Sequence, residues 1–275
     1  MDEIRMVLRR GVSGSPHYVP DFDARLQWAA MVLLGPIESY FRYEIRGLEQ
    51  VPRRGPVLIV TNTGPLPIHA LLLGRQMRSQ VKRAPRILLD ERLAGAAPLR
   101  ELTRRLGLDF DDERRAEQLL AAEELVIMMP GGAEEAFKNP RLRYRLLWSG
   151  REGLASVAIR TQATVIPAAC YGVDDMYRVV DAPARLLRAV LGPWVPALPL
   201  LLGAAGTLLP RPVRLIQELG MPIRSQYPAE AATDPAIARG FHRRILGEVQ
   251  SQLDNMLLER GGFASGWRGS PRGAR

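Results

Sequence analysis

Residues 125–138 read LVIMMPGGAEEAFK and combine two signals that decide the fold. The first five residues are apolar and uncharged, which predicts a short strand buried on both faces. The glycine pair that follows, Gly131 and Gly132, lets the backbone approach a ligand closely and can direct N–H groups toward an anion. The stretch therefore predicts a buried strand, a ligand-binding turn and a helix in immediate succession.

Similar apolar runs recur on both sides of this stretch, separated by segments with helical periodicity. Short strands are expected at 57–61, 87–89, 165–169 and 214–219, and the first three of them are uncharged. Helices are expected from about residue 68 to 80 and at 99–106, 113–122, 150–161 and 236–258. The alternation predicts a single α/β domain whose central sheet is mixed, mostly parallel and flanked by helices.

Composition divides the chain into three parts. Residues 1–45 are expected to form an N-terminal interfacial segment, residues 46–260 the α/β domain, and residues 261–275 a flexible basic tail. Within the first part, residues 26–37 are uncharged, but a helix of this length cannot cross a hydrocarbon core of about 30 Å. The run could lie in a bilayer interface with Trp28 at headgroup level, or cover the domain as an ordinary buried helix.

A second uncharged run, residues 189–210, is long enough to span a bilayer but contains three prolines, Pro193, Pro196 and Pro199. Each proline removes a backbone donor and disfavours a regular helix. The run predicts an apolar lid or interfacial segment, a loop buried over the core is the alternative, and a full span is the least favoured reading.

The termini and the single cysteine bear on location. The N-terminus opens with Asp2 and Glu3, unlike a secretory signal peptide, and Cys170 alone cannot form an internal disulfide. We therefore expect a cytoplasmic protein that is peripheral to the inner face of the membrane, with no metal site.

The charge balance points to an anionic partner. Lys and Arg number 38 against 29 Asp and Glu, for a net charge of +9. Such an excess suits nucleic acid or an anionic bilayer surface. Aromatic residues make up only 6% of the chain and no RNA-binding motif is present, which argues against nucleic acid and leaves the phospholipid surface as the expected partner.

Several blocks of the sequence resemble one family. They are GLEQVPRRGPVLIVTN from residue 47, PGGAEEAF from 130, YRLLWSGREGLASVAIRTQATVIPAACYGVDDMY from 144, and PRPVRLIQELGMPI from 210. In order and spacing these blocks resemble the lysophospholipid and glycerolipid acyltransferase superfamily, in particular its diacylglycerol acyltransferase-like branch. The resemblance implies transfer of a fatty acyl group from acyl-CoA or another acyl thioester to the hydroxyl of a lysophospholipid, monoacylglycerol or diacylglycerol, with no cofactor beyond that co-substrate.

The first family motif departs from its usual form here. In the family, a His after the first core strand acts as general base and an Asp a few residues later orients its ring. Asn62 matches that motif, but Thr63 stands at the position of the His, and His69 falls near the position of the Asp. Either His69 serves as a displaced base, oriented by Asp90, Glu134 or Glu135, or the chain is a catalytically silent relative that still binds acyl-CoA or lipid.

The third motif supplies the expected substrate-binding residues. By resemblance, Gly131 and Gly132 after Pro130 hold the glycerol or phosphate part of the acceptor, and Glu134 or Glu135 matches a trailing acid. The same residues could instead turn the chain and occupy a first helical turn, where acids are favoured. Arg114 falls near a second-motif arginine that contacts the acceptor, and its alternative is a solvated helix face.

Overall fold

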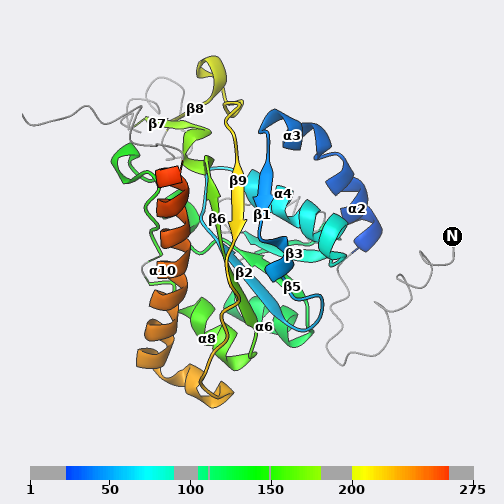
Figure 1. Ribbon diagram of the computed structural model, residues 1–275, viewed down its shortest axis with the longest axis vertical. Coiled ribbons are helices and arrows are strands. Elements are labelled where there is room, and N and C mark those ends of the chain that lie inside the picture. The colour runs from blue at the N-terminus through cyan, green and yellow to red at the C-terminus, as the bar shows by residue number, and fades with distance from the viewer. Residues whose placement is uncertain (1–22, 90–104, 111, 149, 181–199, 260–275) are drawn as a thin grey trace, which may run out of the picture.

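The computed structural model describes residues 23–89, 105–110, 112–148, 150–180 and 200–259. They form one α/β domain around a seven-stranded, mixed and mostly parallel sheet, which confirms the predicted fold class (Figure 1). The strands in chain order are β1 (Glu44–Arg46), β2 (Val57–Thr61), β3 (Pro85–Leu89), β4 (Leu108–Phe110), β5 (Leu125–Met128), β6 (Thr164–Tyr171) and β9 (Ile216–Leu219). Their order across the sheet is β1-β9-β6-β2-β5-β3-β4.

β2 is a central strand, and its carboxyl end lies among the carboxyl ends of the other parallel strands. β2 lies between β5 and β6 and pairs with both in parallel, and β3 continues the parallel part to β4. β9 pairs antiparallel with β6 and parallel with β1, so these two strands run the other way. The segments that follow the parallel strands therefore all begin at the carboxyl ends of those strands. Open α/β sheets bind their ligands at these ends.

Helices cover both faces of the sheet (Figure 1). Leu58 and Val60 of β2 pack with α6 (Glu113–Ala121), α8 (Gly153–Arg160) and α10 (Pro235–Glu259), which form one covering layer. Val57 and Ile59 point to the other face and pack with α4 (Ile68–Gln76), which also contacts α2 (Ala24–Val32). Since every residue of β2 is buried, the strand carries no charge, and this explains its unbroken apolar run.

The main elements appear close to their expected bounds. The strand at 57–61 is confirmed without change, the helix at 113–122 corresponds to α6, and the helix from 68 divides into α4 and a π-helical turn, Met77–Val81. The sequence did not indicate β1 or β4, nor the separate antiparallel pair β7 (Arg178–Val180) and β8 (Leu200–Leu202). Each of these strands has three residues, too few to show a period. Most of the helix expected at 99–106 lies outside the described residues.

The expected interfacial run at 26–37 forms two helices. α2 ends at Val32, and α3 (Gly35–Tyr40) begins with Pro36 in its first turn, a position that suits proline because the N–H is unpaired there anyway. Residues 1–22, the tail at 261–275 and residues 189–199 of the second apolar run lie outside the described residues. Within the ranges that are described, no helix combines the length and the apolar character needed to cross a bilayer.

Candidate functional site

Asn62, the first residue after β2, fastens the end of that strand to β6. Its Oδ1 accepts a hydrogen bond from the Cys170 N–H at 2.7 Å, and its Nδ2 donates to the Cys170 carbonyl at 3.1 Å. Both residues are buried. The side chain that the first motif predicted as part of the catalytic group is therefore engaged on both polar atoms by the main chain of β6.

His69, near the start of α4, faces the interior of the protein. The ring is fully buried, and its Nε2 donates to the Asn62 carbonyl at 2.8 Å. Burial lowers the pKa of His69 from 6.5 to about 4, so the ring is neutral at physiological pH. No described residue hydrogen-bonds Nδ1. The structure thus places the proposed displaced base in the packing behind the β2 exit, holding that loop in position.

Glu135 joins the third motif to the first. One oxygen accepts from the Thr63 N–H at 2.6 Å and the other from the Leu147 N–H at 2.8 Å. Burial raises the pKa of Glu135 to about 7, and the positive charge of Lys138 opposes that rise. A methyl group on Gly131 would lie 2.4 Å from the Glu135 side chain, so the glycine leaves the room that this carboxyl occupies.

The other predicted site residues are spread around this connection. Thr63 is fully buried, and its hydroxyl has no hydrogen bond within the described chain. Pro130 is buried, and Gly132 has a φ of +52°, which favours glycine at the turn. Glu134 on α7 (Gly132–Ala136) and Arg114 on α6 are exposed, and neither lines the hollow described next.

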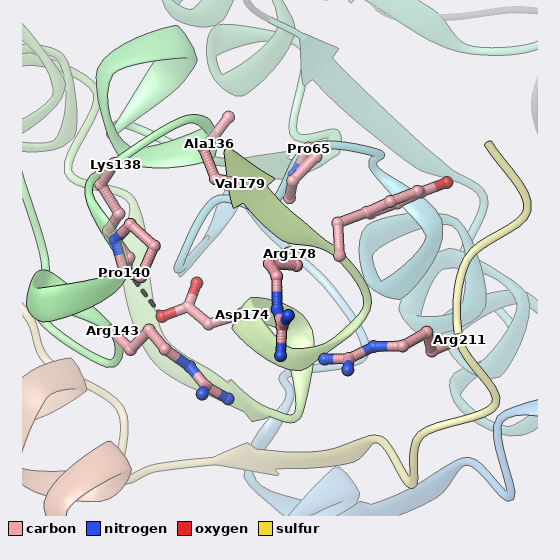
Figure 2. A pocket seen from close by; sticks show the side chains of 10 residues that line it. Pro65, Ala136, Lys138, Pro140, Arg143, Asp174, Arg178, Val179 and Arg211 are labelled. Atoms are coloured by element: carbon pink, nitrogen blue, oxygen red, sulfur yellow. Dashed lines mark ion pairs between the residues drawn. The ribbon is translucent and has the colours of Figure 1, made fainter. Parts of the chain in front are cut away.

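A hollow of about 160 Å³ opens beside the C-terminal end of α7 (Figure 2). Pro65 after β2, Lys138 after α7, Asp174 after β6 and Arg178 on β7 contribute to its wall. The described residues that line it are Pro65, Ala136, Lys138, Pro140, Arg143, Asp174, Tyr177, Arg178, Val179 and Arg211, and none of them is a histidine.

One carboxylate faces the hollow. Asp174 Oδ2 pairs with Lys138 Nζ at 2.9 Å, and both side chains are more than nine-tenths buried. Lys138 Nζ also donates to the Arg145 carbonyl at 2.9 Å, which fixes the ammonium. The second oxygen of Asp174 points into the hollow (Figure 2). The sequence did not indicate Asp174 or Lys138 as site residues, although Asp174 stands in the block that begins at residue 144 and Lys138 directly follows the block that begins at residue 130.

Seven exposed apolar side chains, termed the apolar surface, lie on α2, α3 and the loop before β9: Trp28, Val32, Leu33, Ile37, Tyr40, Leu208 and Leu209. Leu33 and Leu208 are each 76% exposed. The Tyr40 hydroxyl donates to the Pro210 carbonyl at 2.7 Å, which joins α3 to that loop, and the hydroxyl of Tyr177, a residue of the hollow, donates to the Leu208 carbonyl at 2.9 Å.

Comparisons with known proteins found one matching family model and several relatives. A family model described as diacylglycerol acyltransferase matches residues 94–195. An uncharacterized protein of Mycobacterium leprae is 31% identical over 229 residues, 81% of this chain and 62% of that protein. The bovine protein named DGAT1/2-independent enzyme synthesizing storage lipids is 26% identical, over 84% of this chain and 69% of its own. Phytyl ester synthase 1 of Arabidopsis thaliana is 25% identical, over 78% of this chain and 34% of its own.

The chain spans about three fifths of the length of the mycobacterial relatives. Among solved structures, the crystal structure of the 1-acyl-sn-glycerophosphate acyltransferase PlsC from Thermotoga maritima aligns with a TM-score of 0.49 at 14% identity. That alignment covers 93% of this chain and 88% of the other.

Proposed function

We propose that this chain, which is similar to glycerolipid acyltransferases, transfers a fatty acyl group from an acyl thioester, acyl-CoA being the expected donor, to the hydroxyl of a glycerolipid. The acceptors proposed are a lysophospholipid, a monoacylglycerol or a diacylglycerol. The observation that carries the proposal is the contact from Tyr177 to Leu208, which sets a polar hollow directly beside an exposed apolar surface. Both halves of an amphipathic substrate have a complementary surface there.

The same apolar surface supports peripheral attachment to the cytoplasmic face of a membrane. Removing one Leu-sized side chain from water contributes about 1.5–3 kcal/mol, so several such side chains can hold a folded domain at a lipid interface. The net charge of +9 adds attraction to anionic lipids. A lipid-bound acceptor would then meet the hollow without leaving the bilayer.

Asp174 is the group proposed to take the proton. The acceptor hydroxyl attacks the thioester carbonyl carbon, a C–O bond forms and the C–S bond breaks. The proton of the hydroxyl passes to the free oxygen of Asp174 and from there to the departing thiolate, which leaves as the thiol. Lys138, paired with the other oxygen, holds the carboxylate in place. A role of His69 as base is not part of this proposal, because its neutral ring is buried away from the hollow.

The threonine at position 63 favours a second candidate function, which is binding without catalysis. Threonine cannot replace the imidazole of the first motif as a base, and its hydroxyl is buried. On this alternative the chain binds acyl-CoA or lipid without turning it over.

An acyl-transfer assay separates the two functions. Purified full-length protein is incubated with radiolabelled acyl-CoA and vesicles that carry lysophospholipid, monoacylglycerol or diacylglycerol. Acyl transfer requires release of CoA together with labelled product, whereas the binding alternative gives retention of the label without product. Asp174→Asn should lower turnover by about 100-fold or more, the usual contribution of a general base. The exposed Glu230→Gln is the matched control, and equal rates in the two variants would exclude Asp174 as base.

Vesicle co-sedimentation tests the attachment. Leu33→Glu and Leu208→Glu should each shift the protein from the pellet to the supernatant. Met221→Glu is the control, because Met221 is 71% exposed but lies away from the hollow. Met221 follows β9, which runs antiparallel to β6 and therefore ends near the amino ends of the parallel strands (Figure 1). Equal loss of binding in all three variants would contradict a defined lipid-facing surface.

A further inference from the structure

The hollow gathers more positive charge than its own carboxylate can balance. Lys138, Arg143, Arg178 and Arg211 all line it, and Asp174 is the only acidic residue among the described residues of its lining. We infer that the hollow is a binding site for the phosphate group of a phosphorylated substrate. This inference deepens the proposed function and rests on it, since it assigns a part of the substrate to a part of the same site.

Two of the four cations have no carboxylate partner among the residues that the structure describes. Lys138 pairs with Asp174, and Arg143 pairs with Asp175, just outside the hollow. Arg211 donates from Nε and Nη2 to the main-chain carbonyl of Asp175, at 3.0 and 2.7 Å. No described residue forms an ion pair or a hydrogen bond with the Arg178 side chain. No carboxylate of the described chain therefore neutralises Arg178 or Arg211 at the hollow.

Arg211 is held in place before any ligand arrives. The two bonds to the Asp175 carbonyl fix the guanidinium of Arg211, and Asp175 is itself held by the Tyr144 hydroxyl at 2.6 Å. The guanidinium groups of Arg143, Arg178 and Arg211 lie toward one another on one side of the hollow (Figure 2). Like charges gathered in this way repel, and an anion between them removes the repulsion. Phosphate oxygens match guanidinium donors in geometry as well as in charge.

The size of the hollow limits what it holds. At about 160 Å³ it is smaller than the roughly 300–1,000 Å³ of pockets that enclose a whole small ligand. It has room for a phosphate group and a few linked atoms, so the rest of the ligand must extend over the neighbouring surface. Two substrates of the proposed reaction carry phosphate: acyl-CoA in its nucleotide part and a phospholipid acceptor in its headgroup. With a neutral acceptor, acyl-CoA would be the substrate whose phosphate the hollow binds.

Direct binding tests this without requiring turnover. Full-length protein is titrated calorimetrically with CoA, pantetheine, glycerol 3-phosphate and glycerol. CoA or glycerol 3-phosphate should bind, and Arg178→Gln and Arg211→Gln should each weaken that binding by about tenfold or more, the loss expected for a charge-assisted hydrogen bond. Arg239→Gln, an exposed arginine on α10, is the matched control and should bind like the unaltered protein. Thermal melts of all variants separate lost binding from lost folding.

The four probes distinguish the source of the phosphate. Binding of CoA but not pantetheine, with no competition by glycerol 3-phosphate, assigns the site to the donor. Displacement of CoA by glycerol 3-phosphate, or binding of glycerol 3-phosphate alone, assigns it to the acceptor headgroup. If pantetheine and glycerol bind as tightly as their phosphorylated counterparts, or if Arg178→Gln and Arg211→Gln bind like Arg239→Gln, the inference is overturned. Phosphate-dependent binding without acyl transfer would support the phosphate site and contradict the proposed reaction. Acyl transfer with an unchanged KM in Arg178→Gln and Arg211→Gln would support the reaction and contradict the phosphate site.

Discussion

Asn62 and Cys170, which lies on the neighbouring strand β6, are joined by two hydrogen bonds: the Cys170 N–H donates to Asn62 Oδ1, and Asn62 Nδ2 donates to the Cys170 carbonyl. The amide thereby continues the connection between β2 and β6 past the last residue of β2. The Asn62 carbonyl in turn accepts from His69. Asn62 thus acts in this chain as a positioning residue for the β2 exit loop.

Replacing Asn62 tests this role. Asn62→Ala removes both bonds and leaves the N–H and the carbonyl of Cys170 unpaired in the interior, so the free energy of unfolding should fall by about 2–4 kcal/mol. Urea denaturation measures the loss. Asn255→Ala, at an exposed position of α10, is the control and should change stability little. Equal stability of the two variants would show that the bridge to Cys170 contributes nothing.

At Thr63 a substitution is expected to raise the stability of the protein, in contrast to Asn62→Ala. Its buried hydroxyl has no partner among the described residues, and an unpaired buried hydroxyl is costly. Thr63→Val keeps a similar shape without the hydroxyl, so stability should rise by about 1 kcal/mol and acyl transfer should be unchanged. A fall in turnover of tenfold or more with normal folding would mean that the hydroxyl takes part in the reaction after all.

Two glycines make a matched pair for the third motif. A Cβ on Gly131 would meet the Glu135 side chain at 2.4 Å, whereas a Cβ on Gly247 of α10 would meet nothing within 4 Å. Gly131→Ala should therefore destabilise the protein by about 1–3 kcal/mol, because Glu135 must leave its bonds to Thr63 and Leu147. Gly247→Ala should stabilise it by about 1 kcal/mol through helix propensity. Thermal melts of both variants check the contrast.

The sequence predicts the centre of this fold better than its edges. The strands at 57–61 and 125–128 are covered by helices on both faces, so their apolar runs are unbroken and readable. β1 is only partly buried along its three residues, and no pattern marks it. The reversed direction of β9 also leaves no local trace, because a short apolar run looks the same in a parallel or an antiparallel pair.

The sequence likewise predicts only part of the candidate site. The sequence contains the motif residues, but the burial of His69 depends on how α4 packs against the sheet. The cations of the hollow come from separate segments after α7, on β7 and before β9, and they meet only in three dimensions. Spacing along the chain could not bring Lys138, Arg178 and Arg211 together.

His69 should lower stability in acid. Its folded pKa is about 4 against an ordinary 6.5, so below about pH 6.5 the unfolded chain binds a proton that the folded chain refuses. The stability due to the neutral ring is present above pH 6.5 and is lost as the pH falls toward 4. His69→Gln retains a donor for the Asn62 carbonyl but cannot titrate. Relative to this variant, the unaltered protein should lose about 2 kcal/mol between about pH 7 and pH 5.

Glu135 should act in the opposite direction over nearly the same range. Its folded pKa is about 7 against an ordinary 4.5, so the folded chain holds a proton that the unfolded chain has lost. This contribution is present below pH 4.5 and is lost as the pH rises through 7. In the unaltered protein, the effects of His69 and Glu135 on the pH dependence of the free energy of unfolding therefore largely cancel. Urea denaturation at several pH values between 5 and 8 should show stability rising toward acid in His69→Gln and falling toward acid in Glu135→Gln, each by about 2 kcal/mol relative to the unaltered protein. Parallel pH profiles in all three proteins would mean that neither group is buried as the structure places it.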